Sequence, residues 1–146
     1  MAIPSPAAPP PPPRQPVGHY TAVNTKMTWN AAKAHCESWG TILAVPHNAE
    51  EETAIESAYG NSNSRWIGIW NGGSGDVYQS IDPPGYNPAV YLRWHTSANP
   101  PTGAGNTAQC VYKRYQASMA MLPDDCDTTE RKFVCQAAPS PPSLPP

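Results

Sequence analysis

The sequence lacks the features that mark membrane-spanning and nucleic-acid-binding proteins. No apolar run approaches the ~18–20 residues that a membrane-spanning helix needs. The net charge is −2, so no basic field favours nucleic acid or an anionic membrane. The opening residues, Met1 to Pro4, have neither the charged start nor the apolar centre of a signal peptide. They fit either a secreted protein whose signal has been removed or a cytosolic protein.

Motifs for metal-dependent or nucleophilic catalysis are missing as well. The histidines form no H-E-x-x-H motif, and no C-x-x-C pair indicates a structural zinc site. No nucleophile elbow accompanies a Ser-His-Asp order. Asp82, or the acidic residues from Asp124 to Asp127, would be the material for a carboxylate pair, but nothing in the sequence sets their separation. We therefore expect a binding protein and not an enzyme.

Proline is abundant, with 20 residues, and it is unevenly distributed. Eight prolines lie in residues 1–16 and five in residues 139–146, whereas the segment between them carries every Trp, Tyr, Phe and Cys. We expect a proline-rich arm over 1–16, one domain over 17–138 and a proline-rich tail over 139–146. The arms are typical of stiff polyproline spacers, and an SH3-type or WW-type ligand beside Arg14 is the alternative.

Four cysteines are present, namely Cys36, Cys110, Cys126 and Cys135. They allow three pairings, and counting does not choose among them. The even number, the small core and the extracellular-looking arms favour disulfides over buried free thiols. Disulfides in turn favour a secreted or extracellular location.

Two helices are marked by their caps. Thr28 is a plausible N-cap for a first helix with an apolar stripe, and Gly40 provides its stop; the stripe consists of Trp29, Ala32, Cys36 and Trp39. Asn48 begins a second helix, with Glu51 three residues later as in a capping box. The acidic run Glu50 to Glu52 suits the positive end of that helix, and we prefer this explanation to a metal site.

The later part of the chain has the pattern of strands. We expect strands over 66–70, 109–113, 118–122 and 132–135, with a turn at 71–75. A long segment rich in Pro, Gly and Asn covers 83–109, and loops of this length are usually functional or disordered. Helices early and strands late predict an α+β fold.

An ordered set of residues resembles the C-type lectin-like domain in its short form. The set runs through Trp29, Ala32, Cys36, Gly40, Leu43, the strand Trp66-Ile67-Gly68-Ile69, Trp94 and the remaining three cysteines. The resemblance covers about Tyr20 to Cys135. It implies two helices, a small antiparallel sheet, a long loop region and the disulfides Cys36–Cys135 and Cys110–Cys126.

The same resemblance implies where a calcium ion would lie in sugar-binding members of the family. Their side-chain oxygens come from the long loop and from the strand before the third cysteine. Here Asn99 retains an oxygen, but the other positions hold Pro101, Ala108 and the run Met121-Leu122-Pro123. Because calcium needs about six to eight oxygen ligands, we expect no functional calcium site of the usual kind and no cofactor.

Three acidic residues beside the third cysteine leave one alternative open. Asp124, Asp125 and Asp127 would form a displaced cation site if the alignment shifted. A solvated acidic turn explains them without a metal, and we favour that interpretation.

The long segment offers residues for recognising a ligand without a metal. We expect ligand contacts from Tyr86, Asn99 and Asn106, because aromatic faces and amides suit sugars. Trp94 is expected in the small core of the loop itself. The expected partner is a glycan or an extracellular protein, so the hypotheses are a carbohydrate-binding module and a protein-interaction or structural domain. The arms resemble those of hydroxyproline-rich matrix glycoproteins, which favours a proline-rich, O-glycosylated extracellular protein.

Overall fold

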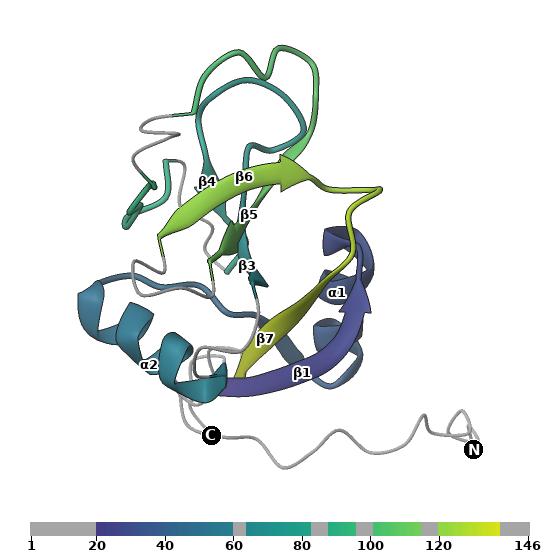
Figure 1. The fold of residues 1–146 in the computed structure, drawn as a ribbon, viewed down its shortest axis with the longest axis vertical. Helices are drawn as coiled ribbons and strands as arrows, with labels where there is room; N and C mark the ends of the chain where they lie inside the picture. Colours follow the sequence, from purple (N-terminus) through teal and green to yellow (C-terminus); the bar gives the residue numbers. More distant parts are fainter. Residues whose placement is uncertain (1–19, 60–63, 83–87, 96–100, 115–119, 138–146) are drawn as a thin grey trace, which may run out of the picture.

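The computed structural model describes residues 20–59, 64–82, 88–95, 101–114 and 120–137. Two helices and seven strands form an α+β domain, as the sequence predicts (Figure 1). The helices are α1 (Trp29–Ser38) and α2 (Ala49–Tyr59). The strands are β1 (Tyr20–Met27), β2 (Thr41–Leu43), β3 (Arg65–Trp70), β4 (Gln79–Ser80), β5 (Gln109–Lys113), β6 (Met121–Asp125) and β7 (Arg131–Ala137). Within these ranges, neither helix is long and apolar enough to cross a membrane.

The strands form one sheet with the order β1-β7-β3-β5-β6, and the short strands β2 and β4 pair with β7 and β3. Neighbours are antiparallel except for β3 and β7, which are parallel. Tyr20, the first described residue, pairs with Gln136, so the two ends of the described chain lie side by side. This end of the molecule is at the bottom of Figure 1, and the loops that follow β3 and precede β5 are at the top.

Helix α1 forms as its sequence predicts. The Thr28 hydroxyl accepts a hydrogen bond from the Ala31 amide at 3.3 Å, and this caps the first turn. Trp29, Ala32 and Cys36 are almost fully buried against the sheet. The Trp29 indole donates to the Ile67 carbonyl at 2.7 Å. Gly40 takes the left-handed conformation after the helix, with φ 73°.

Helix α2 is short of apolar residues and is held at its start by side chains. The Asn48 side chain accepts from the Glu51 amide at 2.8 Å, which confirms the N-cap. Ile55 is its fully buried residue and packs with Ala44 and Val134. Most of what fixes this helix to the domain is therefore polar.

The two disulfides join the pairs that the resemblance implies. Cys36 in α1 bonds to Cys135 in β7, and Cys110 in β5 bonds to Cys126 after β6. All four sulfurs lie in one apolar cluster with Trp29 and other residues. Gly68 in β3 lies so close to β2 that an added Cβ would meet the Leu43 carbonyl oxygen at 2.8 Å. The main core is thus closed covalently and packed tightly.

Two of the longer strands depart from the sequence prediction, and the short strands β2 and β4 were not predicted. β1 was not anticipated, because only Val23 of its eight residues is buried and its pattern is largely polar; pairing with β7 makes it a strand. β6 covers Met121–Asp125 and not 118–122, of which 118 and 119 lie outside the described residues. Pro123 has no amide hydrogen, and β6 tolerates it because it is an edge strand.

Candidate functional site

Two loops arch next to one another at the end of the molecule away from Tyr20 and Gln136. One runs from Asn71 to Tyr78 between β3 and β4, and the other from Pro101 to Ala108 before β5 (Figure 1). The Gly75 amide donates to the Gly105 carbonyl at 2.6 Å and joins them directly.

A single buried amide, Asn71, connects both loops to strand β5. Its Nδ2 donates to the carbonyl oxygens of Gly75 and Thr107, each at 2.9 Å. Its Oδ1 accepts from the amides of Gly73 at 3.1 Å and Gln109 at 2.9 Å. Because the Asn71 side chain has two donors and two acceptor positions, its capacity is fully used. The loops are therefore fixed by protein hydrogen bonds.

Asp76 fixes the second loop in the same way. One carboxylate oxygen accepts from the Gly103 amide at 3.1 Å and the other from the Ala104 amide at 3.0 Å. Charge-assisted bonds of this kind are stronger than neutral ones. Each oxygen keeps further acceptor capacity, because a carboxylate offers about four lone-pair positions.

Between the two loops and the strands β5 and β6 lies a hollow of about 220 Å³. Its lining mixes hydroxyl, amide, carboxylate and apolar surfaces, from Asp76, Tyr78, Pro101, Thr102, Gly103, Ala104, Thr107, Gln109 and Pro123. Thr102 and Thr107 are exposed, and Gln109 is half-buried. Burial, together with the charge of Asp76, raises the pKa of Tyr78 to about 12, so this phenol stays protonated at neutral pH. The arrangement suits a small polar ligand with some apolar surface.

Of the three residues expected to contact a ligand, the structure describes Asn106. Tyr86 and Asn99 lie outside the described residues. Asn106 is exposed in the turn closed by the Thr107 amide and the Ala104 carbonyl, on the loop that carries the hollow, but it is not part of the lining. Hollow-lining Thr102 and Gln109 were not singled out from the sequence, because nothing local marks them.

Two of the positions expected to have lost calcium ligands line the hollow. Pro101 and Pro123 both line it and present carbon to it. Ala108 packs against the main core, and Met121 is fully buried.

Beneath the loops, Trp94 is partly buried against a second apolar cluster, whose residues come mostly from the sheet and not from the loop alone. It packs against a group formed by Ile67, Ile69, Tyr78, Val111 and Met121. Its ring meets the Tyr78 ring edge-on, with centroids 4.9 Å apart. The Tyr78 side chain is therefore held from below by the cluster while its other side borders the hollow.

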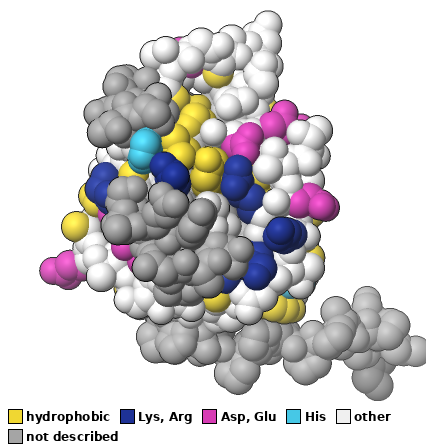
Figure 2. Space-filling view, in the orientation of Figure 1, with side chains coloured by type: hydrophobic (Ala, Val, Ile, Leu, Met, Phe, Trp, Pro, Cys, Tyr) yellow, Lys and Arg dark blue, Asp and Glu magenta, His cyan; other side chains and the backbone are white. Residues whose placement is uncertain are grey.

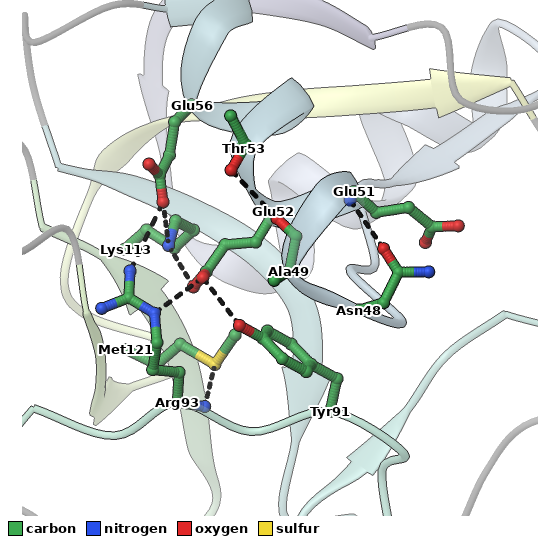
Figure 3. A network of polar contacts seen from close by, with 10 residues as sticks. All are labelled: Asn48, Ala49, Glu51, Glu52, Thr53, Glu56, Tyr91, Arg93, Lys113 and Met121. Carbon is green, nitrogen blue, oxygen red and sulfur yellow. Dashed lines mark hydrogen bonds and ion pairs between the residues drawn. The ribbon is translucent and has the colours of Figure 1, made fainter.

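A buried charge network ties α2 to β5 and to the long segment (Figure 3). Lys113 is fully buried, and its Nζ lies 2.6 Å from Glu52 Oε2 and 2.9 Å from Glu56 Oε2. The other oxygen of Glu52 accepts from Arg93 Nε at 2.7 Å and from the Tyr91 hydroxyl at 3.0 Å. Burial alone raises the pKa of Glu52, but the bonds from Arg93 and Lys113 outweigh it and hold that pKa below its ordinary value.

A second polar link joins α2 to the end of β4. His47 Nδ1 lies 2.7 Å from Glu51 Oε1, and Nε2 lies 2.7 Å from Asp82 Oδ2. Burial lowers the pKa of His47, but the hydrogen bonds and charges of Asp82 and Glu51 raise it by more. The imidazole therefore favours its charged form in the folded protein.

These links change the interpretation of the acidic run in α2. Helix electrostatics explained Glu50 to Glu52 from the sequence alone, but the structure gives Glu51 and Glu52 partners as well. Lys113 was the available signal, because a lysine in the otherwise buried strand β5 requires a partner. The sequence does not say that Glu52, 61 residues away, is that partner.

The acidic residues around the third cysteine each have a partner within the protein. Asp124 lies 2.5 Å from Arg131, and Asp127 accepts from the Asn30 side chain. Asp125 accepts from the Asp127 amide, and its pKa is lowered by such bonds from the following turn. Over the described ranges, no group of three His, Cys, Asp or Glu side chains is arranged to hold a metal ion.

Comparisons with known proteins agree on one fold. The family model described as the lectin C-type domain matches residues 25–137. Human chondrolectin is 24% identical over 148 residues, which cover 84% of this chain and 52% of that protein. The chain thus spans about half the length of the curated relative it matches.

Solved structures of similar fold include an antifreeze protein and C-type lectin domains. A calcium-independent type II antifreeze protein has a TM-score of 0.68 at 22% identity, covering 82% of this chain and 85% of that one. The human scavenger receptor C-type lectin carbohydrate-recognition domain has a TM-score of 0.67 at 22% identity, covering 82% and 90%. The C-type lectin domain of murine dendritic cell inhibitory receptor 2, solved with an N-glycan, has 0.64 at 24% identity, covering 82% and 90%.

Proposed function

Because the chain belongs to the C-type lectin domain family, we propose that it is an extracellular module that binds carbohydrate in the loop hollow without the usual calcium ion. Domains of this family are generally non-enzymatic binding modules and are typically extracellular or secreted. The observation that carries the proposal is the mixed polar and apolar lining of the hollow.

We propose a site without calcium because too few oxygen ligands are present. A calcium ion needs about six to eight oxygen ligands. Pro101 and Pro123 offer carbon where the family resemblance puts ligands, and the Ala108 side chain is a methyl group. Asn99 alone retains a usable oxygen at those positions. The bonds that Asp124, Asp125 and Asp127 make to their neighbours support an acidic turn in place of a displaced cation site.

We propose that hydrogen bonds within the protein, in place of a calcium ion, hold the two loops in position. Asn71 joins both loops to β5, and Asp76 holds the amides of Gly103 and Ala104. A site that is already ordered loses less entropy when a ligand binds. Calcium-independent members of the same fold are represented by the antifreeze protein described above.

The lining fits the chemistry of a sugar ring. The hydroxyls of Thr102 and Thr107 and the amide of Gln109 can exchange hydrogen bonds with sugar hydroxyls. Pro101 and Pro123 present apolar surface against which the C–H face of a sugar can pack. Tyr86, Asn99 and Asn106 remain proposed ligand contacts.

Glycan-array screening followed by calorimetric titration tests the proposal. We expect saturable glycan binding that is unchanged by a chelator. Thr107→Val should weaken it about two- to tenfold, the value of one hydrogen bond. Thr25→Val, the same change at an exposed position of β1, should have no effect. Binding that disappears with the chelator, or no glycan binding at all, would contradict the proposal.

One observation favours a second function, that of a protein-interaction or structural domain carried on proline-rich spacers. The pairing of Tyr20 with Gln136 puts both arm attachment points together, away from the loops. A proline-rich chain could then carry the domain as a side-projecting head. Unmodified arms in the native protein, seen by mass spectrometry, would weaken this matrix-glycoprotein alternative. Binding to an extracellular protein without dependence on sugar would favour it over the lectin.

A further inference from the structure

Among the residues that the structure describes, nine line the hollow, and Asp76 is the one with an acidic or basic side chain. The remaining side chains are hydroxyl, amide or apolar, and Tyr78 keeps its proton. In the described part of the chain, no Lys, Arg or His side chain contributes to the lining.

The sequence around the hollow adds no cation to this. Residues 71–81 and 101–109 contain one charged residue between them, Asp76. The internal segments outside the described structure, 60–63, 83–87, 96–100 and 115–119, contain no Asp, Glu, Lys, Arg or His. Their positions in space therefore do not alter the charge that a ligand in the hollow meets.

Three cationic side chains outside the hollow are engaged in other contacts. Arg93 and Lys113 lie in the network with Glu52, and Arg131 pairs with Asp124 while lying over the Tyr112 ring. Figure 2 shows the loop end at the top of the view as white with small areas of yellow and magenta, while Lys and Arg lie lower. Among the described residues, the loop end on this face therefore shows acidic side chains but no Lys or Arg.

We infer that the hollow selects neutral and amino sugars and disfavours uronic and sialic acids, with Asp76 as the residue that determines this preference. The inference rests on the proposed carbohydrate-binding function. Asp76 accepts one amide on each oxygen, which leaves acceptor positions for an ammonium group. A ligand carboxylate would meet like charge with no cation to offset it.

The expected size of the effect follows from the exposure of Asp76. Two unit charges about 4 Å apart in water interact strongly enough to change an affinity about fivefold. An amino sugar should therefore bind about fivefold more tightly than its neutral counterpart, and the uronic acid about fivefold more weakly. At about 1 M salt the Debye length is about 3 Å, so these differences should largely disappear.

Calorimetry with glucosamine, glucose and glucuronic acid, and with the matching galacto series, at about pH 6 and low salt, tests the inference on the wild-type protein. If amino sugars bind best and uronic acids worst, the inference stands. Equal affinities, or uronic acids binding best, overturn it and leave the proposed function intact. If no sugar of either series binds and the array is also blank, the proposed function itself fails.

Charge variants locate the effect. Asp76→Asn should reduce the roughly 25-fold ratio between amino sugar and uronic acid to about one. Asp127→Asn, the same change in the turn after β6 and outside the lining, should not. If Asp76→Asn does not fold, Thr102→Lys adds a cation at the exposed rim and should favour the uronic acid. Thr25→Lys in β1 is its matched control. A control that shifts the ratio as far as its partner variant would overturn the assignment to the hollow.

Discussion

Different interactions stabilise the two ends of the molecule. At the α1 and β7 end, Trp29, Cys36 and Phe133 are buried in an apolar cluster and a disulfide closes it. At the loop end, a buried amide and an exposed carboxylate carry the structure through hydrogen bonds. A buried polar network is costly when it is only partly satisfied, so it is sensitive to the loss of a single partner. The domain thus combines a robust base with an end whose shape depends on a few polar residues.

The largest difference between the ends should appear when the disulfides are removed. In the chain-entropy model, a closed loop of about 100 residues contributes about 4–5 kcal/mol and one of about 16 residues about 3 kcal/mol. We expect Cys36→Ala/Cys135→Ala to unfold the domain at physiological temperature and Cys110→Ala/Cys126→Ala to destabilise it less. Urea unfolding followed by tryptophan fluorescence measures both. An equal or reversed order would contradict the central role given to the longer bridge.

Removing Lys113 should come next in size. Lys113→Met leaves Glu52 and Glu56 facing each other without their buried cation, which costs about 3–5 kcal/mol. The double variant Lys113→Met/Glu52→Gln should lose less than the sum of its single changes. Denaturant titrations of all three variants give the coupling energy. Additive losses would show that the network does not act as a unit.

Asn71→Ala should separate stability from loop order. The change removes four hydrogen bonds and leaves buried backbone groups unpaired, so we expect a loss of about 2–3 kcal/mol. Hydrogen exchange should accelerate at Gly73 and Gln109 and remain slow in β7. Asn106→Ala, at an exposed position, is the control and should leave exchange unchanged. Acceleration spread evenly over the domain would show that the two ends are not independent.

The smallest effect concerns pH. The pKa of His47 is raised in the folded state, so its contribution to stability is present below about pH 6.5 and is lost as the pH rises through the folded value. Because the group is partly exposed, we expect less than about 1 kcal/mol. His47→Gln should remove this slope in thermal melts between about pH 6 and pH 8. The same loss in the wild-type protein and in His47→Gln would assign the slope to another group.

Low pH should also weaken the attachment of α2 to the domain, because it protonates Glu52. The pKa of Glu52 is lowered in the folded state, so its stabilisation is present above its ordinary value and is lost as the pH falls below about 4.5. Glu52→Gln, measured in the same melts, should flatten the acid limb. An unchanged acid limb in that variant would show that other carboxylates govern it.

The base of the molecule is the part that the sequence predicts well. The cap at Thr28, the stripe of α1 and the apolar strand β3 are local patterns, and the family resemblance supplied the disulfide pairs. β1 was not predicted because its sequence is largely polar, and it becomes a strand by pairing with β7, which is distant in sequence. β6 was misplaced because it contains Pro123, and it pairs with the preceding strand β5.

The loop end is the part that the sequence predicts poorly. The turn at 71–75 was expected, but the role of Asn71 depends on Thr107 and Gln109, which lie 36 and 38 residues away. The sequence alone shows that Pro101 and Pro123 stand at positions where the family resemblance implies calcium ligands. The hollow that these residues border can be recognised only in the three-dimensional structure. Polar networks between distant segments produce no periodic pattern in the sequence. Only single unusual residues, such as the lysine Lys113 in an apolar strand, indicate them.

Glycan binding measured by calorimetry in the presence of EDTA tests the central claim most directly. The account predicts saturable binding with the same affinity before and after calcium is restored. Binding that appears only when millimolar calcium is added back would show that the hollow depends on a metal ion, and the account would be wrong.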